Sequence, residues 1–188
     1  MDMFIIIIGL LAYLVGAIPT GYLIAKLKGI ADIREHGSGN IGATNVSRIL
    51  GKQYFFLIFL IDAGKALLFI HAIKPYFDFD YLCICAGIVL FGNGCSVFLR
   101  GSGGKGVATL FGLLVALSTH TAVMLFGIWA ILLAITRTVG LASVGAAVWL
   151  PFCAYLMHNP PLFLFSLFAT LWIVQTHRSN IAAYWNNR

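Results

Sequence analysis

Charge is the property that this sequence has least of. Charged residues make up 10% of its 188 residues, and only 6 residues are acidic. Because about a quarter of the residues in a soluble domain are charged, an ordinary soluble domain is excluded, and so is charge-rich disorder. The sequence also lacks the basic runs of nucleic-acid-binding tails, so we expect no DNA or RNA partner.

Cysteine and proline are scarce as well. The chain has 5 prolines and 4 cysteines, and it contains neither a C-x-x-C pair nor a cluster of histidine with cysteine. These absences exclude a collagen-like repeat and a disulfide scaffold, and they argue against zinc or iron–sulfur binding. We therefore expect no zinc or iron–sulfur site and four buried, unreactive thiols.

Apolar residues are abundant instead. They make up 61% of the chain, and the mean hydropathy is +0.96. This composition predicts an all-α integral membrane protein in which residues 1–188 form a single membrane-embedded domain. A helix needs roughly 20 apolar residues to cross ~30 Å of hydrocarbon. On that basis spans or near-spans are expected at 3–25, 54–73, 81–99, 120–136, 139–157 and 161–176.

The two remaining questions are the fate of the first span and the number of crossings. Residues 3–25 lack the basic start of a signal peptide, so we expect an uncleaved transmembrane helix. A seventh apolar segment, 107–118, is short for a crossing. If it does cross and the N-terminus is outside, only Lys74 among the loop cations lies outside, whereas cytoplasmic loops are the ones enriched in Lys and Arg. The cytoplasmic set is then Lys26, Lys28, Arg34, Arg48, Lys52, Arg100, Lys105, Arg137, Arg178 and Arg188. We therefore expect seven transmembrane helices with the C-terminus in the cytoplasm.

This topology has a functional consequence. It places four polar segments on the cytoplasmic face, namely 34–48, 100–109, 137–143 and 177–181. Polar segments that converge on one side of an apolar bundle predict a site at that side.

The first of these segments contains GSGNIGATNVSR at 37–48. These letters include the dinucleotide fingerprint G-x-G-x-x-G, but a Rossmann site requires a preceding strand, and here a membrane helix and a basic loop precede it. Glycines let backbone N–H groups approach a ligand closely, and small polar residues at the start of a helix bind anions. Arg48 would add a bidentate donor for phosphate. The segment therefore predicts a phosphate site.

The second segment contains GSGGKGVAT at 101–109. It lacks the GK[ST] ending and the preceding strand of a P-loop, which excludes a nucleoside triphosphatase of that class. A nest of glycine amides, a lysine and a helix that begins at Val107 still suit a phosphate group.

The other polar positions are fewer. On a continuing helix His177 and Asn180 would share a face, because they are three residues apart. Ser143 either contributes to the site or bonds the preceding helical turn. Asp62 and Lys65 lie at i, i+3 spacing inside an apolar span, and we expect them to form an internal ion pair.

Three motifs in this order, GSGNIGATNVSR at 37–48, GGKGVAT at 103–109 and HRSNI at 177–181, resemble those of the bacterial acyl-phosphate:glycerol-3-phosphate acyltransferase family (PlsY type). The resemblance covers essentially the whole chain. It implies a multi-pass enzyme of the bacterial cytoplasmic (inner) membrane with its active site facing the cytoplasm. Such an enzyme transfers a fatty acyl group from acyl-phosphate to glycerol 3-phosphate in phospholipid synthesis. The products are lysophosphatidic acid and inorganic phosphate, and neither a cofactor nor an obligate protein partner is implied.

The resemblance also implies roles for residues that match the motifs. The catalytic set would be Ser38, Arg48, Lys105, Ser143, His177 and Asn180. The substrate-binding set would be Gly37, Thr44, Asn45, Gly103, Gly104 and Gly106.

These sets suggest a division of labour. We expect Lys105 and the 103–106 amides at one phosphate, with Arg48 and Ser38 near the other. Asn180 or Ser143 would donate to the carbonyl oxygen, and His177 would act as a general base or bind phosphate. No G-x-S-x-G elbow occurs, so no serine nucleophile is expected.

The chain departs from the family pattern at Asn93, where histidine is usual, at Ser96, where proline is usual, and at Ala183, where arginine is common. Two other functions stay open on the residues alone: a non-catalytic membrane protein that binds or transports phosphorylated metabolites, and a structural helix bundle. The one-sided polar segments argue against transport, because transporter sites usually lie near the bilayer midplane.

Overall fold

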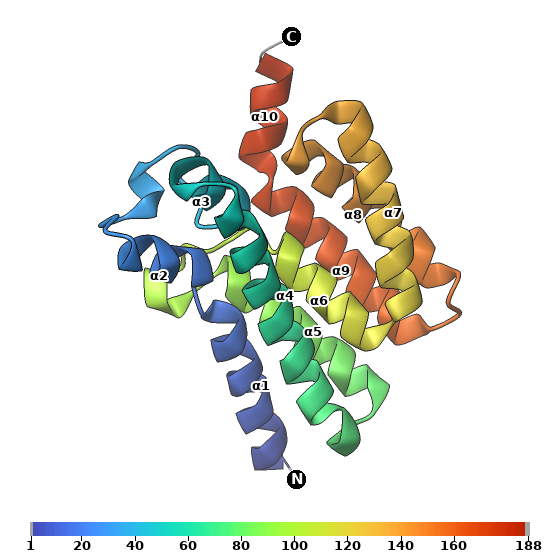
Figure 1. The fold of residues 1–188 in the computed structure, drawn as a ribbon. Helices are drawn as coiled ribbons and strands as arrows, with labels where there is room; N and C mark the ends of the chain where they lie inside the picture. The colour runs from blue at the N-terminus through green and yellow to red at the C-terminus, as the bar shows by residue number, and fades with distance from the viewer. Residues whose placement is uncertain (1, 187–188) are drawn as a thin grey trace.

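The computed structural model describes residues 2–186, so Arg188 of the expected cytoplasmic set lies outside the described residues. The described part is helical throughout (Figure 1). Its α-helices are α1 (Asp2–Ala17), α2 (Thr20–Leu27), α3 (Ala43–Leu50), α4 (Gln53–Ile73), α5 (Phe79–Gly94), α6 (Val107–Leu117), α7 (Thr119–Thr136), α8 (Val139–Tyr155), α9 (Pro160–Thr176) and α10 (Arg178–Asn186). Three short 3-10 helices join them, η1 (Ile33–Glu35), η2 (Lys74–Tyr76) and η3 (Val97–Leu99).

Six of the seven expected spans correspond to helices α4 to α9, with ends shifted by a few residues. Within residues 2–186 the stretches Gln53–Tyr76, Phe79–Leu99 and Thr119–Thr136 are long and apolar enough to cross a membrane. Helices α6, α8 and α9 are apolar but shorter. The short helix α6 lies against α4 so closely that a Cβ on Gly112 would come 2.0 Å from the Ala63 carbonyl oxygen. Small residues permit this kind of close backbone contact between membrane helices.

The expectation of one continuous first helix is wrong. Helix α1 ends at Ala17, α2 begins at Thr20, and the two helices are bent by 44° relative to each other. Pro19 lies at the break. Proline lacks an N–H group and its ring clashes with the preceding turn, so it interrupts a helix at this kind of position. Helix α2 therefore leaves the line of α1 and lies beside α3 (Figure 1).

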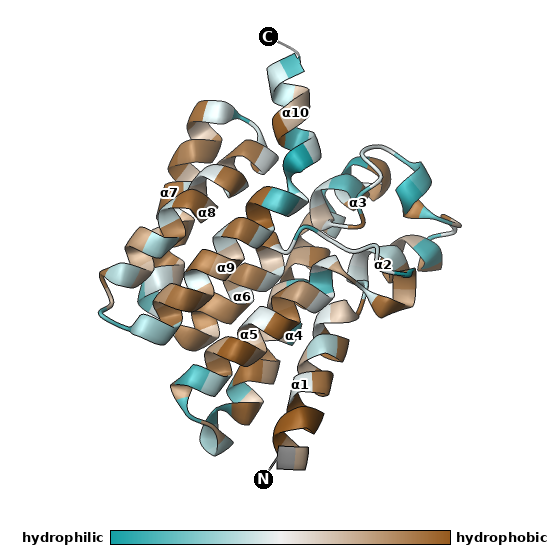
Figure 2. Cartoon of the chain, turned by 180° about the vertical axis from the view of Figure 1, so that it is seen from behind, coloured by the Kyte–Doolittle hydropathy of each residue, from teal (hydrophilic) through white to brown (hydrophobic). Residues whose placement is uncertain are grey.

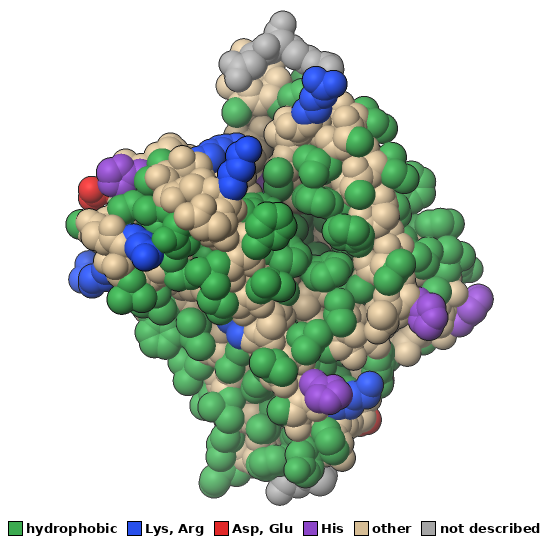
Figure 3. Space-filling model, viewed as in Figure 1, with side chains coloured by type: hydrophobic (Ala, Val, Ile, Leu, Met, Phe, Trp, Pro, Cys, Tyr) green, Lys and Arg blue, Asp and Glu red, His purple; other side chains and the backbone are tan. Residues whose placement is uncertain are grey.

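The core and the surface follow the distribution of polar residues. Ile70, Leu90, Leu113, Leu150 and Ile173, which come from five different helices, are fully buried. Hydrophobic residues dominate the middle of the bundle, and hydrophilic residues gather toward its two ends (Figure 2). Lys and Arg side chains are concentrated at the end where α2, α3 and α10 lie (Figure 3). The large apolar side chains that remain exposed along the bundle are typical of a surface that faces lipid.

Candidate active site

The loop before α3 is held in shape by the side chain of Asn45. The Asn45 side-chain oxygen Oδ1 accepts a hydrogen bond from the Ser38 N–H at 2.8 Å, and its side-chain nitrogen Nδ2 donates to the His36 backbone carbonyl at 2.9 Å. Asn45 is buried. Gly37 has a φ of +61°, a backbone conformation that glycine adopts without strain. A Cβ on Gly37 would lie 2.3 Å from the Asn45 Oδ1. The two hydrogen bonds of the Asn45 side chain, called the Asn45 latch below, therefore also require glycine at position 37.

The Asn45 latch leaves the side chains of Ser38, Thr44 and Arg48 free to bind a ligand. Ser38 and Arg48 are exposed, and Thr44 is half-buried in the first turn of α3. The N-terminus of α3 has no side-chain cap, and its first N–H groups therefore lack intrahelical partners. The segment presents backbone donors, two hydroxyls and a guanidinium, all of which suit an anion.

The second glycine loop is built on the end of α5. The Gly104 N–H donates to the Asn93 carbonyl at 2.8 Å. A Cβ on Gly103 would lie 2.3 Å from the same Asn93 oxygen and 2.4 Å from the Gly94 carbonyl group. Gly106 has a φ of +83° and precedes α6, whose N-terminus also lacks a side-chain cap. Close packing on the end of α5 therefore fixes this loop, and the first N–H groups of α6 have no side-chain acceptor.

Lys105 connects this loop to the C-terminal helices. Its ammonium group donates to the Asn180 side-chain oxygen, and its backbone carbonyl accepts from the Thr176 hydroxyl at 3.1 Å. Asn180 in turn packs on α8, where a Cβ on Gly140 would lie 2.3 Å from the Asn180 amide nitrogen. The polar segments at 100–109, 137–143 and 177–181 therefore meet around Lys105, as the charge pattern predicts.

The electrostatic character of this cluster is positive. Burial lowers the pKa of Lys105 from its usual value, and the nearby charge of Arg48 lowers it further. The ion pairs among the described residues are Arg34–Asp32 and Lys65–Asp62, so neither Lys105 nor Arg48 has a carboxylate partner there. Two cations that repel each other electrostatically, without a carboxylate to neutralise them, favour the binding of an anion.

His177 is buried and points back along α9. Its Nδ1 lies 2.8 Å from the Ile173 carbonyl, and burial lowers the pKa of His177 to about 4. Helix α9 ends at Thr176 and α10 begins at Arg178, with His177 between them. The His177 carbonyl accepts from the Asn180 N–H at 2.9 Å and from the Ile181 N–H at 3.0 Å, so the chain turns directly into α10. A neutral histidine with so low a pKa is a weak base near pH 7.

Ser143 is also buried, in the second turn of α8. Its hydroxyl donates to the Val139 carbonyl at 2.8 Å and accepts from the Trp129 indole nitrogen at 3.2 Å. The sequence allowed two roles for Ser143, a part in the site or a hydrogen bond to the preceding helical turn. The structure has this hydrogen bond.

The sequence offered only weak signals for three further residues of the cluster. Asn93 supplies the carbonyl that holds Gly104, Thr176 holds the Lys105 carbonyl, and Gly140 makes room for Asn180. Thr109, in the first turn of α6, has a fully buried hydroxyl with no partner in the described part of the chain. A buried polar atom of this kind calls for a ligand or a water.

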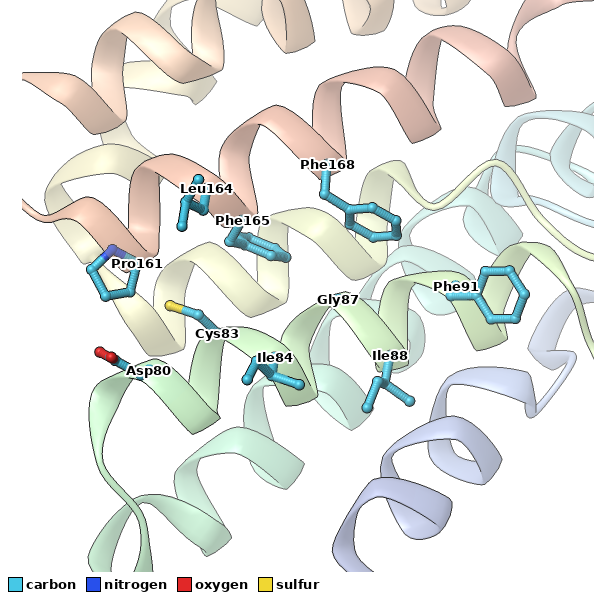
Figure 4. Close-up of a pocket in the computed structure, with 10 residues that line it drawn as sticks. All are labelled: Asp80, Cys83, Ile84, Gly87, Ile88, Phe91, Pro161, Leu164, Phe165 and Phe168. Atoms are coloured by element: carbon cyan, nitrogen blue, oxygen red, sulfur yellow. The ribbon is translucent and has the colours of Figure 1, made fainter. Parts of the chain in front are cut away.

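An apolar groove of about 550 Å³ lies between α5 and α9. Its lining runs from Asp80 and Pro161 at one end to Phe91 and Phe168 at the other (Figure 4). Beyond Phe168, the ring of Trp172 contacts Phe91 at 5.1 Å between centroids.

Trp172 links this groove to the glycine loop. A Cβ on Gly94 would come 2.6 Å from its ring, and Gly94 is also the residue against which Gly103 packs. Trp172 therefore packs between the Phe91 end of the groove and the backbone that supports the loop carrying Lys105.

Comparison with known proteins decides the family. The family model described as glycerol-3-phosphate acyltransferase matches residues 6–187. The chain belongs to this family. The glycerol-3-phosphate acyltransferase of Thermosynechococcus vestitus is 44% identical, over 94% of this chain and 90% of the relative. That of Prochlorococcus marinus strain MIT 9312 is 40% identical, over 94% of this chain and 91% of the relative.

Two solved structures of the family show the same fold. Both are of PlsY (YgiH), an integral membrane glycerol 3-phosphate acyltransferase. The glycerol 3-phosphate form aligns with a TM-score of 0.92 at 34% identity, and the lysophosphatidic acid form with 0.90 at 33%. Each alignment covers 98% of this chain and 93% of the PlsY chain. The expected resemblance to this acyltransferase family is confirmed.

Proposed function

We propose that this protein transfers a fatty acyl group from acyl-phosphate to glycerol 3-phosphate, which yields lysophosphatidic acid and inorganic phosphate. The observation that carries the proposal is the cluster of two glycine-rich loops around Lys105 and Arg48, neither of which pairs with a carboxylate among residues 2–186. Both substrates carry a phosphate, and the cluster offers two separate sets of backbone donors with a cation each. Family membership supplies the reaction that such a cluster serves.

The structure supports a division of the site into two halves. The Lys105 ammonium, the Gly103 and Gly106 amides and the start of α6 would bind one phosphate. The Gly104 amide serves this half by holding the loop on the Asn93 carbonyl. Arg48, Ser38 and Thr44, with the backbone of Gly37, would bind the other. Asn45 serves the second half by holding its loop rather than by touching substrate.

Three residues at the junction of α8, α9 and α10 have different parts to play. Asn180 orients the Lys105 ammonium through its side-chain oxygen, and its amide nitrogen remains a donor for the acyl carbonyl oxygen. Ser143 and His177 act on the shape of the site, because each is buried and already bonded to its own helix.

The chemistry needs little from acid–base groups. The hydroxyl oxygen of glycerol 3-phosphate attacks the acyl carbonyl carbon, the C–O bond to phosphate breaks, and inorganic phosphate leaves with the electron pair. Phosphate is a good leaving group, so catalysis rests on positioning and on donors to the oxyanion. His177 is a weak base at neutral pH, and a phosphate oxygen of a substrate is the acceptor for the hydroxyl proton.

We further propose that the acyl chain lies in the groove between α5 and α9. The groove is lined almost wholly by apolar side chains, and at its Phe91 end Trp172 packs against Gly94, the residue that supports the glycine loop. An alkyl chain there keeps its carbonyl end near Lys105 and its tail toward Asp80.

The membrane arrangement follows from charge. We propose seven crossings by one domain over residues 1–188, with α1 and α2 as a bent first crossing, in the bacterial inner membrane. Lys and Arg gather at the end that carries the site (Figure 3), and retained cations mark the cytoplasmic side. The site then faces the cytoplasm, where glycerol 3-phosphate is soluble.

The test is an assay of purified protein in detergent micelles with palmitoyl-phosphate and labelled glycerol 3-phosphate. We expect labelled lysophosphatidic acid with palmitoyl-phosphate and none with palmitoyl-coenzyme A. Lys105→Met should lose the activity, and Lys74→Met, the same change in η2 after the far end of α4, should keep it. Binding of glycerol 3-phosphate without product from either donor would favour the binding or transport function instead.

A further inference from the structure

The break between α1 and α2 leaves carbonyl groups without helical partners, inside an apolar bundle. Such groups must find other donors, because no water competes for them there. Lys65 of α4 supplies two of these donors: its Nζ lies 2.7 Å from the Ile18 carbonyl and 3.3 Å from the Gly16 carbonyl. The Ser96 hydroxyl supplies a third, at 2.5 Å from the Ala17 carbonyl.

An acidic partner completes the arrangement. Asp62 lies 2.8 Å from the Lys65 Nζ, so the expected ion pair is confirmed. The same Asp62 oxygen accepts from the hydroxyl of Thr20 at 2.7 Å, and Thr20 is the first residue of α2. The Lys65 side chain is 10% exposed and that of Asp62 is 13% exposed. The pair therefore joins the end of α1 to the start of α2 from the neighbouring helix.

Lys65 has no hydrogen left for a substrate. An ammonium group has three donors, and here they are directed to Ile18, Gly16 and Asp62. A role for Lys65 in the reaction must accordingly be indirect.

Both halves of the proposed site rest on the residues that Lys65 and Asp62 hold. On one side, α2 touches the first glycine loop, because a Cβ on Gly21 would lie 1.9 Å from the Ile41 carbonyl oxygen and 3.2 Å from Val46 of α3. Helix α3 carries Arg48.

On the other side, the start of the second loop is tied to α1. The Tyr13 hydroxyl donates to the Cys95 carbonyl at 2.8 Å, next to the Ser96 bond to Ala17. The Gly101 N–H then donates to the Ser96 carbonyl at 2.8 Å. The break is thus the place where the supports of the two glycine loops meet.

We propose that Asp62 and Lys65 are positioning residues of the acyl transfer reaction, which set the placement of the 37–48 loop relative to the 100–106 loop. The inference rests on the proposed function. Each loop is shaped by its own contacts, Asn45 for one and Asn93 for the other, so either can bind a phosphate without Lys65. What Lys65 and Asp62 determine is whether the two bound substrates face each other, and this affects the rate of the transfer step more than binding.

The test compares purified variants per amount of folded protein, judged by size-exclusion profile and Tm. The double variant Asp62→Asn/Lys65→Met removes both charges together, so it leaves no unpaired ion in the bundle. We expect its kcat to fall about 100-fold, as a misplacement of about 1 Å does, with the KM for glycerol 3-phosphate within about threefold of the parent. Lys65→Arg keeps a cation with donors for the same carbonyls and should recover about tenfold of this loss.

Two further variants keep the proposal testable if the double variant folds poorly. Thr20→Val removes only the hydroxyl that Asp62 accepts from and should lower kcat about threefold to tenfold, again at an unchanged KM. Lys74→Met, at the first residue of η2 directly after α4, should leave both constants within about twofold of the parent.

The outcomes are separable from those of the proposed function. A folded double variant, or Thr20→Val, with the kcat of the parent overturns the inference alone, and so does a rise in KM at constant kcat. A parent protein without acyl transfer from acyl-phosphate overturns the proposed function and the inference with it.

Discussion

The packing of Gly103 on the end of α5 makes a sharp prediction about the substitution Gly103→Ala. The added Cβ would lie 2.3 Å from the Asn93 carbonyl oxygen and 2.4 Å from the Gly94 carbonyl group. Ordinary contact begins at 3.4 Å, and all three atoms that it meets are backbone. No side-chain rotation can relieve the clash, so the loop itself must withdraw by about 1 Å.

The cost of that shift can be estimated from the contacts. The Gly104 N–H bond to Asn93 is 2.8 Å long, and lengthening it by about 1 Å breaks it. The loss of one such bond costs about 1 kcal/mol of stability. The same shift moves the Lys105 backbone relative to α6, and a misplacement of about 1 Å lowers catalysis about 100-fold. This corresponds to about 2.7 kcal/mol of lost transition-state stabilisation.

The assay is kcat/KM with palmitoyl-phosphate and glycerol 3-phosphate, with Tm measured on the same preparations. Gly127→Ala is the matched control, since nothing lies within 4 Å of a Cβ added there in the middle of α7. It should keep full activity and gain slightly in stability, as alanine does over glycine within a helix. Gly103→Ala with the activity of the parent would show that the placement of this loop does not limit the reaction.

Three other predictions concern single side chains. Lys105→Met should lower kcat/KM by about 100- to 1,000-fold, as the loss of a charged donor to the reacting phosphate does, and retention of a tenth of the activity would contradict its proposed role. Asn45→Ala should raise the KM of one substrate about tenfold because it frees the 36–38 backbone, whereas Asn45→Asp, which keeps the acceptor for Ser38, should give a smaller rise; equal effects would refute the latch. The pKa of His177 is lowered from 6.5 to about 4, so its stabilisation of the fold is complete above pH 6.5 and is lost as the pH falls toward 4, at up to about 1.4 kcal/mol per pH unit. Tm scans between pH 8 and pH 4.5 should therefore show a steeper acid loss for the parent than for His177→Asn, and parallel curves would count against a buried neutral histidine.

Long apolar segments made most of the fold predictable. Helices α4 to α9 follow the hydrophobic runs, because a helix satisfies the backbone hydrogen bonds of such a run within the run itself. The break in the first helix was missed although Pro19 marks it in the sequence. A single proline hardly changes the mean hydropathy of a whole span, so the hydropathy pattern does not show the break. Proline is also tolerated in membrane helices when neighbouring groups satisfy the freed carbonyls. Here the donors are Lys65 and Ser96, which lie far along the chain.

The site was predictable as a set of segments but less so as a set of roles. Glycines beside Lys105 and Arg48 identify the loops, and the i, i+3 spacing of Asp62 and Lys65 identifies their ion pair. The part that Asn45 plays depends on where its amide points, and it bonds the backbone seven and nine residues away. The bond from the Thr176 hydroxyl to the Lys105 carbonyl joins residues 71 positions apart, so it likewise depends on the tertiary structure.

The central claim is that the two glycine loops around Lys105 and Arg48 bring an acyl-phosphate and glycerol 3-phosphate together for transfer. The most direct test is product formation by the purified parent protein with palmitoyl-phosphate and labelled glycerol 3-phosphate, beside Lys105→Met. We expect the parent protein to form labelled lysophosphatidic acid and an equal amount of inorganic phosphate, and Lys105→Met to form about 100-fold less of both. Phosphate release without labelled lysophosphatidic acid, or equal product from the two proteins, would contradict it.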